Sequence, residues 1–176
     1  MPTRRTFLVA GLAGGATLAA AWWLRGTRDA APTPAATAAL AALDPQAPAI
    51  VAAIASVLLD GALPAEAAGR AAAVDATVAN VARAVEGLPP SAQHELGQLF
   101  ALLAFAPTRV ALARVTPSWR EARPEDVGTM LARFRDSRFT LLRSAYAALH
   151  QLVFAAWYGD PAAWTAIGYP GPPELS

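Results

Sequence analysis

The stretch DSRFTLLRSAYAALHQLVFAAWYG, residues 136–159, predicts the longest helix of the chain and, through it, the fold class. Large apolar side chains recur every three or four positions, a spacing that puts them on one face of an α-helix. Asp136 or Ser137 is expected to cap the start of this helix. The predicted buried face consists of Phe139, Leu142, Tyr146, Leu149, Val153 and Trp157.

Two earlier segments show the same period. The first is expected to start at Pro45, with Asp44 as its cap, and to end near Gly61 and Pro64. The second spans about Ala65 to Glu86, and Gly87 is a plausible left-handed residue at its C-terminal end. Their apolar faces are Ile50, Ile54, Val57 and Leu58 in one, and Val74, Val78, Val81 and Val85 in the other.

Two more helices are expected in the second half of the chain. One follows Pro89 and Pro90, with Ser91 as cap, and Pro107 breaks or kinks it before a further turn over residues 109–114. Trp119 is expected to attach the next loop to the core, before a helix that opens at Pro124. The inward residues are Leu96, Leu99, Phe100 and Leu103, then Val127, Met130, Leu131 and Phe134. Because no segment alternates as a strand would, the sequence predicts an all-α bundle of about five helices.

The composition narrows the classes of function. The chain has 176 residues, no cysteine, and a formal net charge of +1. Without cysteine it has no disulfide, iron–sulfur, thiolate-zinc or c-type haem attachment site. All of its basic residues are arginines, and the charge is close to neutral, so there is no electrostatic reason to expect nucleic-acid binding.

The N-terminus matches a twin-arginine export signal. Arg4 and Arg5 follow a hydroxyl residue and precede Phe7 and Leu8, and a weakly apolar run reaches Leu24. Cleavage could follow residues 29–31 or 36–38, or the run could remain as a membrane anchor. The expected division is therefore a signal or anchor over residues 1–26, a Pro/Ala-rich linker over 27–43, and a helical domain over 44–176.

No catalytic constellation emerges from the motifs. His94 and His150 stand apart from any carboxylate at helical spacing, and no dinucleotide fingerprint, P-loop or nucleophile elbow is present. No catalytic, cofactor-binding or metal-binding residue is therefore assigned. A charged group is expected to tie the last two helices together or to contact an anion or a partner: Arg133, Arg135, Asp136, Arg138 and Arg143.

The C-terminal stretch is rich in aromatic residues and proline. Proline limits the freedom lost when a segment is immobilised, and Trp and Tyr are frequent interface hot spots. The stretch either closes one end of the bundle or presents a partner surface. The residues expected at a partner interface are Trp157, Tyr158, Trp164, Ile167, Tyr169, Pro170 and Pro172.

Together with this leader, two segments of the chain resemble the small subunit, or subunit 3, of gluconate 2-dehydrogenase-type complexes. The segments are LPPSAQHELGQLFALLAFAPTR (88–109) and FRDSRFTLLRSAYAALHQLVFAAWYGDPAAWTAIGYPGPP (134–173). The resemblance implies a non-catalytic subunit without a cofactor of its own. Its implied partners are an FAD-dependent dehydrogenase of the glucose–methanol–choline type, the twin-arginine translocase and, in many complexes, a multihaem cytochrome c. Many members carry cysteines, so the cysteine-free sequence puts any covalent link to a partner in doubt.

The leading hypothesis is an accessory subunit that escorts such a dehydrogenase to the periplasm, where it is released or stays anchored to the inner membrane. The expected substrates of the complex are sugars, sugar acids, alcohols or sterols. One alternative is a stand-alone periplasmic helical domain that binds a small apolar ligand. Another is a small enzyme that uses His150 as a base.

Overall fold

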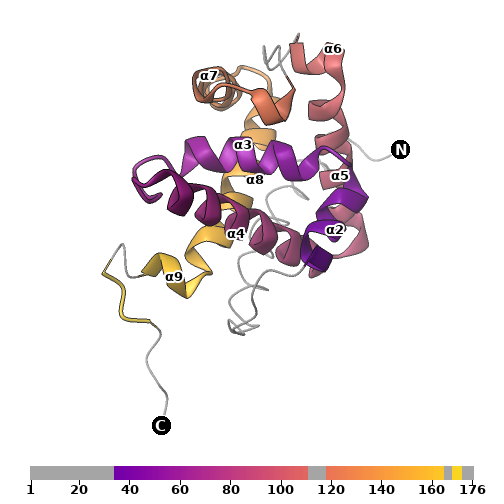
Figure 1. The fold of residues 1–176 in the computed structure, drawn as a ribbon. Helices are drawn as coiled ribbons and strands as arrows, with labels where there is room; N and C mark the ends of the chain where they lie inside the picture. The colour runs from indigo at the N-terminus through magenta and orange to yellow at the C-terminus, as the bar shows by residue number, and fades with distance from the viewer. Residues whose placement is uncertain (1–33, 111–117, 165–167, 172–176) are drawn as a thin grey trace.

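The computed structural model describes residues 34–110, 118–164 and 168–171, and over these ranges the protein is helical and without strands. The predicted all-α class is therefore confirmed. The helices, shown in Figure 1, are α2 (Pro34–Leu43), α3 (Ala47–Leu58), α4 (Ala67–Glu86), α5 (Pro90–Ala104), α6 (Ala106–Thr108), α7 (Pro124–Arg135), α8 (Thr140–Tyr158) and α9 (Pro161–Trp164), with a 3₁₀ turn η2 (Trp119–Glu121). The five expected helices correspond to α3, α4, α5, α7 and α8.

Helix α8 crosses behind α3 and α4 in the view of Figure 1, with α7 near one of its ends and α9 at the other. It packs against α3, α4 and α7, while α2 packs against α3, α4 and α5. With 19 residues, α8 is about 28 Å long. Its two ends therefore present separate surfaces of the bundle.

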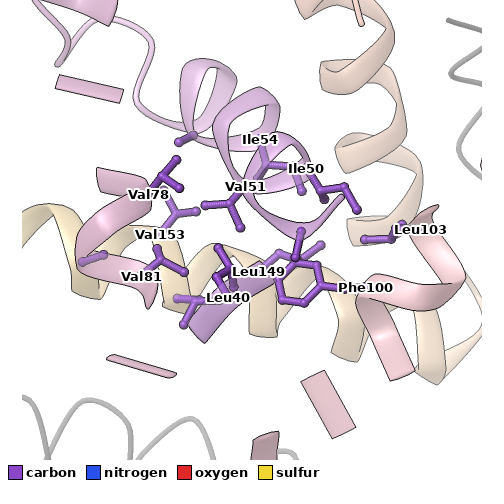
Figure 2. Packing of buried hydrophobic residues seen from close by; sticks show 14 of the residues in the cluster. Leu40, Ile50, Val51, Ile54, Val78, Val81, Phe100, Leu103, Leu149 and Val153 are labelled. Atoms are coloured by element: carbon purple, nitrogen blue, oxygen red, sulfur yellow. The ribbon is translucent and has the colours of Figure 1, made fainter. Parts of the chain in front are cut away.

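The core forms where these helices meet. Figure 2 shows side chains from α2, α3, α4, α5 and α8 converging on one region. Ile50 and Ile54 of α3 and Phe100 of α5 have no exposed surface. Burying a side chain of this size contributes about 1.5–3 kcal/mol to the free energy of folding. The apolar residues that the helical period predicts for α7, namely Val127, Met130, Leu131 and Phe134, are all buried as well.

The loop before α7 is attached to the core as expected. Trp119 is only 2% exposed, and its indole N–H donates a hydrogen bond of 2.9 Å to the carbonyl oxygen of Leu103. Leu103 lies near the end of α5, which stops at Ala104 before the extended residue Phe105. Pro107 has no N–H to donate to the carbonyl of Leu103, four residues earlier, so the helix cannot continue unbroken. The predicted break at Pro107 is thus confirmed, and most of the expected turn over 109–114 lies outside the described residues.

Several predicted caps are wrong. Helix α5 begins at Pro90, so Ser91 is inside its first turn, and α8 begins at Thr140, beyond Asp136 and Ser137. Proline suits the first position of a helix, because the N–H that it lacks would have no acceptor within the helix and its φ is already helical. Helix α5 therefore starts at Pro90 without a side-chain cap from Ser91. Ser137 instead accepts a hydrogen bond from the Phe139 N–H at 3.1 Å. Gly87 has φ of −79°, so it is not left-handed.

The start of α4 shows a cap that the sequence analysis missed. The carboxylate of Glu66 accepts hydrogen bonds from the N–H groups of Ala68 and Gly69, at 2.9 and 2.6 Å. These bonds, first from Ala68 and then from Gly69, lower the pKa of Glu66. The cap therefore stabilises the fold above the ordinary carboxyl range and loses its effect as the pH falls through the lowered pKa.

The second half of the expected linker is a helix of the bundle, which corrects the boundary at residue 44. Helix α2 packs along α4, and its Leu40 is completely buried. Alanine strongly favours helix, and the leucines of PAATAALAAL need only one apolar surface to pack against. That surface is provided by α4 and α5, so residues 34–43 belong to the bundle.

We expect Leu40→Ala to lower the free energy of unfolding by about 2–5 kcal/mol, because it leaves a cavity in the core. The control is Leu102→Ala, at a leucine that is 51% exposed, which should change the stability by less than about 0.5 kcal/mol. Urea unfolding followed by circular dichroism gives both values. Equal, small effects would show that α2 is not part of the cooperative core.

Candidate partner interface

Four ring side chains form a continuous row along α8. Tyr146, His150, Phe154 and Tyr158 are spaced four residues apart, which places them on one side of the helix. The rings of His150 and Phe154 stack with centroids 4.3 Å apart and an interplanar angle of 16°. Tyr146 and Tyr158 extend the row in either direction, at 5.6 and 5.8 Å. Tyr158, at the C-terminal end, is 42% exposed.

The tail after α8 adds two aromatic rings next to this end. The indole N–H of Trp164 donates to the carbonyl oxygen of Tyr158 at 2.7 Å, and the Tyr169 N–H donates to the carbonyl of Trp164 at 3.0 Å. The rings of Trp164 and Tyr169 meet edge to face with centroids 5.3 Å apart. Trp164 is half-buried, while Tyr169 is 46% exposed. The described residues of the tail thus place two aromatic rings beside the C-terminal end of α8, and one of these rings is exposed.

Two glycines in the described part of the tail adopt backbone conformations that other residues rarely allow. Gly168 and Gly171 have φ of +68° and +100°, a region that other residues rarely adopt. A Cβ at Gly171 would also lie 3.3 Å from Cζ3 of Trp164. The backbone at Gly171 therefore lies close to the six-membered ring of the indole, with little room for a side chain. Proline at position 170 restricts the same segment further.

A polar contact joins this end of α8 to α4. Asn80, a buried residue of α4, donates through Nδ2 to Oδ2 of Asp160 at 3.0 Å and to the carbonyl oxygen of Ala156 at 3.3 Å. Its Oδ1 accepts from Arg83 at 3.0 Å, and Oδ1 of Asp160 accepts from the N–H of Ala162. Asn80 is thus hydrogen-bonded at both ends of its amide. We name the contact between Asn80 and Asp160 the α4–tail latch.

Trp157 is a core residue and not part of the outer surface. It is 9% exposed, and its Nε1 has no hydrogen-bond partner among the described residues. Leaving a buried donor unpaired costs about 1–3 kcal/mol, which the burial of the large ring offsets. Trp157 therefore closes the bundle, whereas the adjacent Tyr158 faces outward.

The structure separates the residues that the sequence assigned to an interface. Tyr158, Trp164 and Tyr169 lie together, Pro170 is exposed beside them, and Trp157 is buried. Ile167 and Pro172 lie outside the described residues, as do the export-signal residues Arg4, Arg5, Phe7 and Leu8. The row on α8 was missed as a site, although the four-residue spacing of its rings was a visible signal.

The ionisable side chains form no evident reaction centre in the described ranges. No group of three His, Asp or Glu residues there could hold a metal ion. His94 contacts Gln98 at 3.0 Å on an exposed turn, and His150 lies in the aromatic row. Asp160 is engaged in the α4–tail latch.

Comparisons with protein-family models, with curated proteins and with solved structures find no match to this chain. Among the described helices, none alone is long and apolar enough to cross a membrane. The pair Thr37–Leu43 and Ala47–Leu58 meets the criteria of length and composition together, with a bend of 109° between its members.

We expect Asn80→Asp to destabilise the protein by about 2–4 kcal/mol at neutral pH, since a buried donor becomes a carboxylate facing Asp160 and a carbonyl oxygen. Repulsion raises the pKa of one carboxyl group of such a pair, so the destabilisation should grow as the pH rises from about 4 to 7. Urea unfolding at both pH values tests this. The matched control, Gln98→Glu at an exposed amide, should show little change, and an equal effect of both substitutions would contradict a structural role for the latch.

Proposed function

We propose that this chain is a non-catalytic accessory subunit that binds an FAD-dependent periplasmic dehydrogenase and escorts it through the twin-arginine pathway. The proposal draws on the N-terminal motif and on the resemblance to the small subunits of gluconate 2-dehydrogenase-type complexes. In this scheme the flavin, and haem where a cytochrome takes part, belong to the partner subunits. The expected substrate of the complex is a sugar, a sugar acid, an alcohol or a sterol.

The exposed aromatic end of α8 is the observation that supports the proposal best. Tyr158 and Tyr169 are each more than 40% exposed, and Trp164 between them is held by its hydrogen bond to the Tyr158 carbonyl. Tyrosine buries a large area at low entropic cost, particularly when its backbone is already ordered. This end of the bundle is suited to contact a protein partner, with the latch keeping the tail in position.

Replacing Arg4 and Arg5 with lysine should retain both this chain and the flavoprotein in the cytoplasm. The reason is that the export receptor reads the arginine pair, and lysine keeps the charge without the guanidinium groups. Cell fractionation with immunodetection of the two proteins measures the effect. A control substitution of Arg25→Lys, outside the motif, should leave export unchanged, and a flavoprotein that still reached the periplasm without its escort would refute this role.

The double substitution Tyr158→Ala/Tyr169→Ala should weaken binding of the flavoprotein by about 30-fold or more, as expected for interface hot spots. The readout is the amount of flavin, measured by visible absorption, that co-purifies with the tagged chain. Phe105→Ala is the control, because Phe105 is 61% exposed at the end of α5, away from the tail. Equal flavin recovery with the unchanged chain, the double variant and Phe105→Ala would exclude this surface as the interface.

A further inference from the structure

The corner between α7 and α8 combines exposed apolar side chains with positive charge. The prediction that Phe139 lies on the buried face is wrong: it is 57% exposed, because it is extended and precedes the first residue of α8, Thr140. Leu141, in the first turn of α8, is 59% exposed. We name the exposed charged and large apolar residues of this segment the α7–α8 corner: Arg133, Arg135, Asp136, Arg138, Phe139, Leu141 and Arg143. Large apolar residues on a convex turn are costly to leave in water, and they mark contact surfaces when they occur together.

The positive charge of this corner is largely uncompensated. Four arginines and one aspartate leave a net charge of +3, and no other Asp, Glu or Arg occurs between residues 127 and 159. Asp136 is held by Arg135, with N–O distances of 2.9 and 3.0 Å. That hydrogen-bonded pairing raises the pKa of Arg135 and lowers the pKa of Asp136. The aspartate is therefore already occupied by one arginine.

The other three arginines form no ion pair with any described residue. Arg138 lies over the ring of Phe139, with its guanidinium carbon 4.9 Å from the centroid. Arg143 donates to the carbonyl oxygen of Ser137 at 2.7 Å and to the hydroxyl of Thr140 at 3.2 Å. These contacts fix the guanidinium groups of Arg138 and Arg143 at the start of α8 without neutralising them. Helix α3, which packs on both α7 and α8, contains no charged residue.

We propose that the α7–α8 corner docks on the anionic surface of a phospholipid bilayer. Phe139 and Leu141 would enter the boundary between headgroups and acyl chains, where aromatic and aliphatic side chains bind interfaces. Arg133, Arg138 and Arg143 would contact the lipid phosphates, because guanidinium groups match phosphate geometry and anionic lipids attract basic clusters.

A bilayer fits this corner better than an acidic protein does. Two exposed apolar side chains at a helix junction offer a small apolar area, whereas a stable protein interface buries about 800 Å² on each partner with matched shape. A fluid bilayer accommodates such side chains without a preformed pocket. The corner is also at the end of α8 opposite Tyr158, about 28 Å away, so docking leaves the candidate partner interface accessible. The proposal does not depend on the escort function.

Because the chain has no cysteine, one introduced thiol can report on one position. We would label Leu141→Cys in the full chain with an environment-sensitive fluorophore and add vesicles with or without phosphatidylglycerol. The expected result is a blue shift and protection from an aqueous quencher with the anionic vesicles alone. The control is Leu102→Cys, of similar exposure, which should not respond. Both proteins carry the same N-terminal segment, so vesicle binding through that segment is common to both, and the arginine substitutions below test whether the corner itself makes the contact.

Replacing Arg133, Arg138 and Arg143 with glutamine should weaken the response at position 141, by about fivefold for each arginine removed. All three side chains are exposed, so the substitutions should leave the fold intact. An unchanged circular dichroism spectrum would show this. Three results would overturn the proposal: no response at position 141, an equal response at position 102, or a response to soluble polyglutamate with none to vesicles. The last would assign the corner to an acidic protein. None of these measurements involves the flavoprotein, so their failure is distinct from failure of the escort function.

Discussion

The arrangement of the bundle depends on one helix without charged residues, whose apolar face lies in the core. Helix α3 has no charged residue, and it contacts α2, α4, α5, α7, α8 and the turn η2. Its one hydroxyl group, that of Ser56, is satisfied within the helix by the carbonyl oxygen of Ala53 at 2.8 Å. Five of its twelve residues are buried and the other seven are half-buried, because the other helices pack against one side of α3. Much of the core lies along this side of α3.

The alanine-rich composition affects how these helices pack. Small side chains allow neighbouring helices to approach closely, but each alanine buries little area. The larger buried side chains therefore carry much of the stabilisation, among them Ile50, Ile54, Phe100 and Leu149. Polar contacts inside the bundle are correspondingly few and specific. The hydrogen bond from Trp119 to Leu103 holds the η2 turn against α5, and the hydrogen bond from Asn80 to Asp160 holds the tail against α4.

Helix α8 links the two surfaces that we associate with binding. Its middle is embedded in the core through Leu149, Leu152 and Val153, which gives both ends a rigid support. One end carries cationic and apolar residues around Phe139, and the other carries Tyr158 beside Trp164 and Tyr169. The two ends differ in chemistry, so they suit different partners: an anionic bilayer and a protein. A rigid helix between them would keep a bound protein at a set distance from the membrane.

The sequence by itself determined the helical class, the five main helices and most of their buried faces, because a helix of 3.6 residues per turn imposes its period directly on the apolar positions. Local start signals were less informative: Ser91 and Ser137 are not caps, since α5 begins at Pro90 and α8 begins at Thr140, after the extended residue Phe139. Only the tertiary structure decided that Leu40 is a core residue, that Trp157 is buried while Tyr158 is exposed, and that Asn80 meets Asp160. Those outcomes depend on which helix lies opposite, and the sequence separation of 80 residues between Asn80 and Asp160 leaves no periodic signal of their contact.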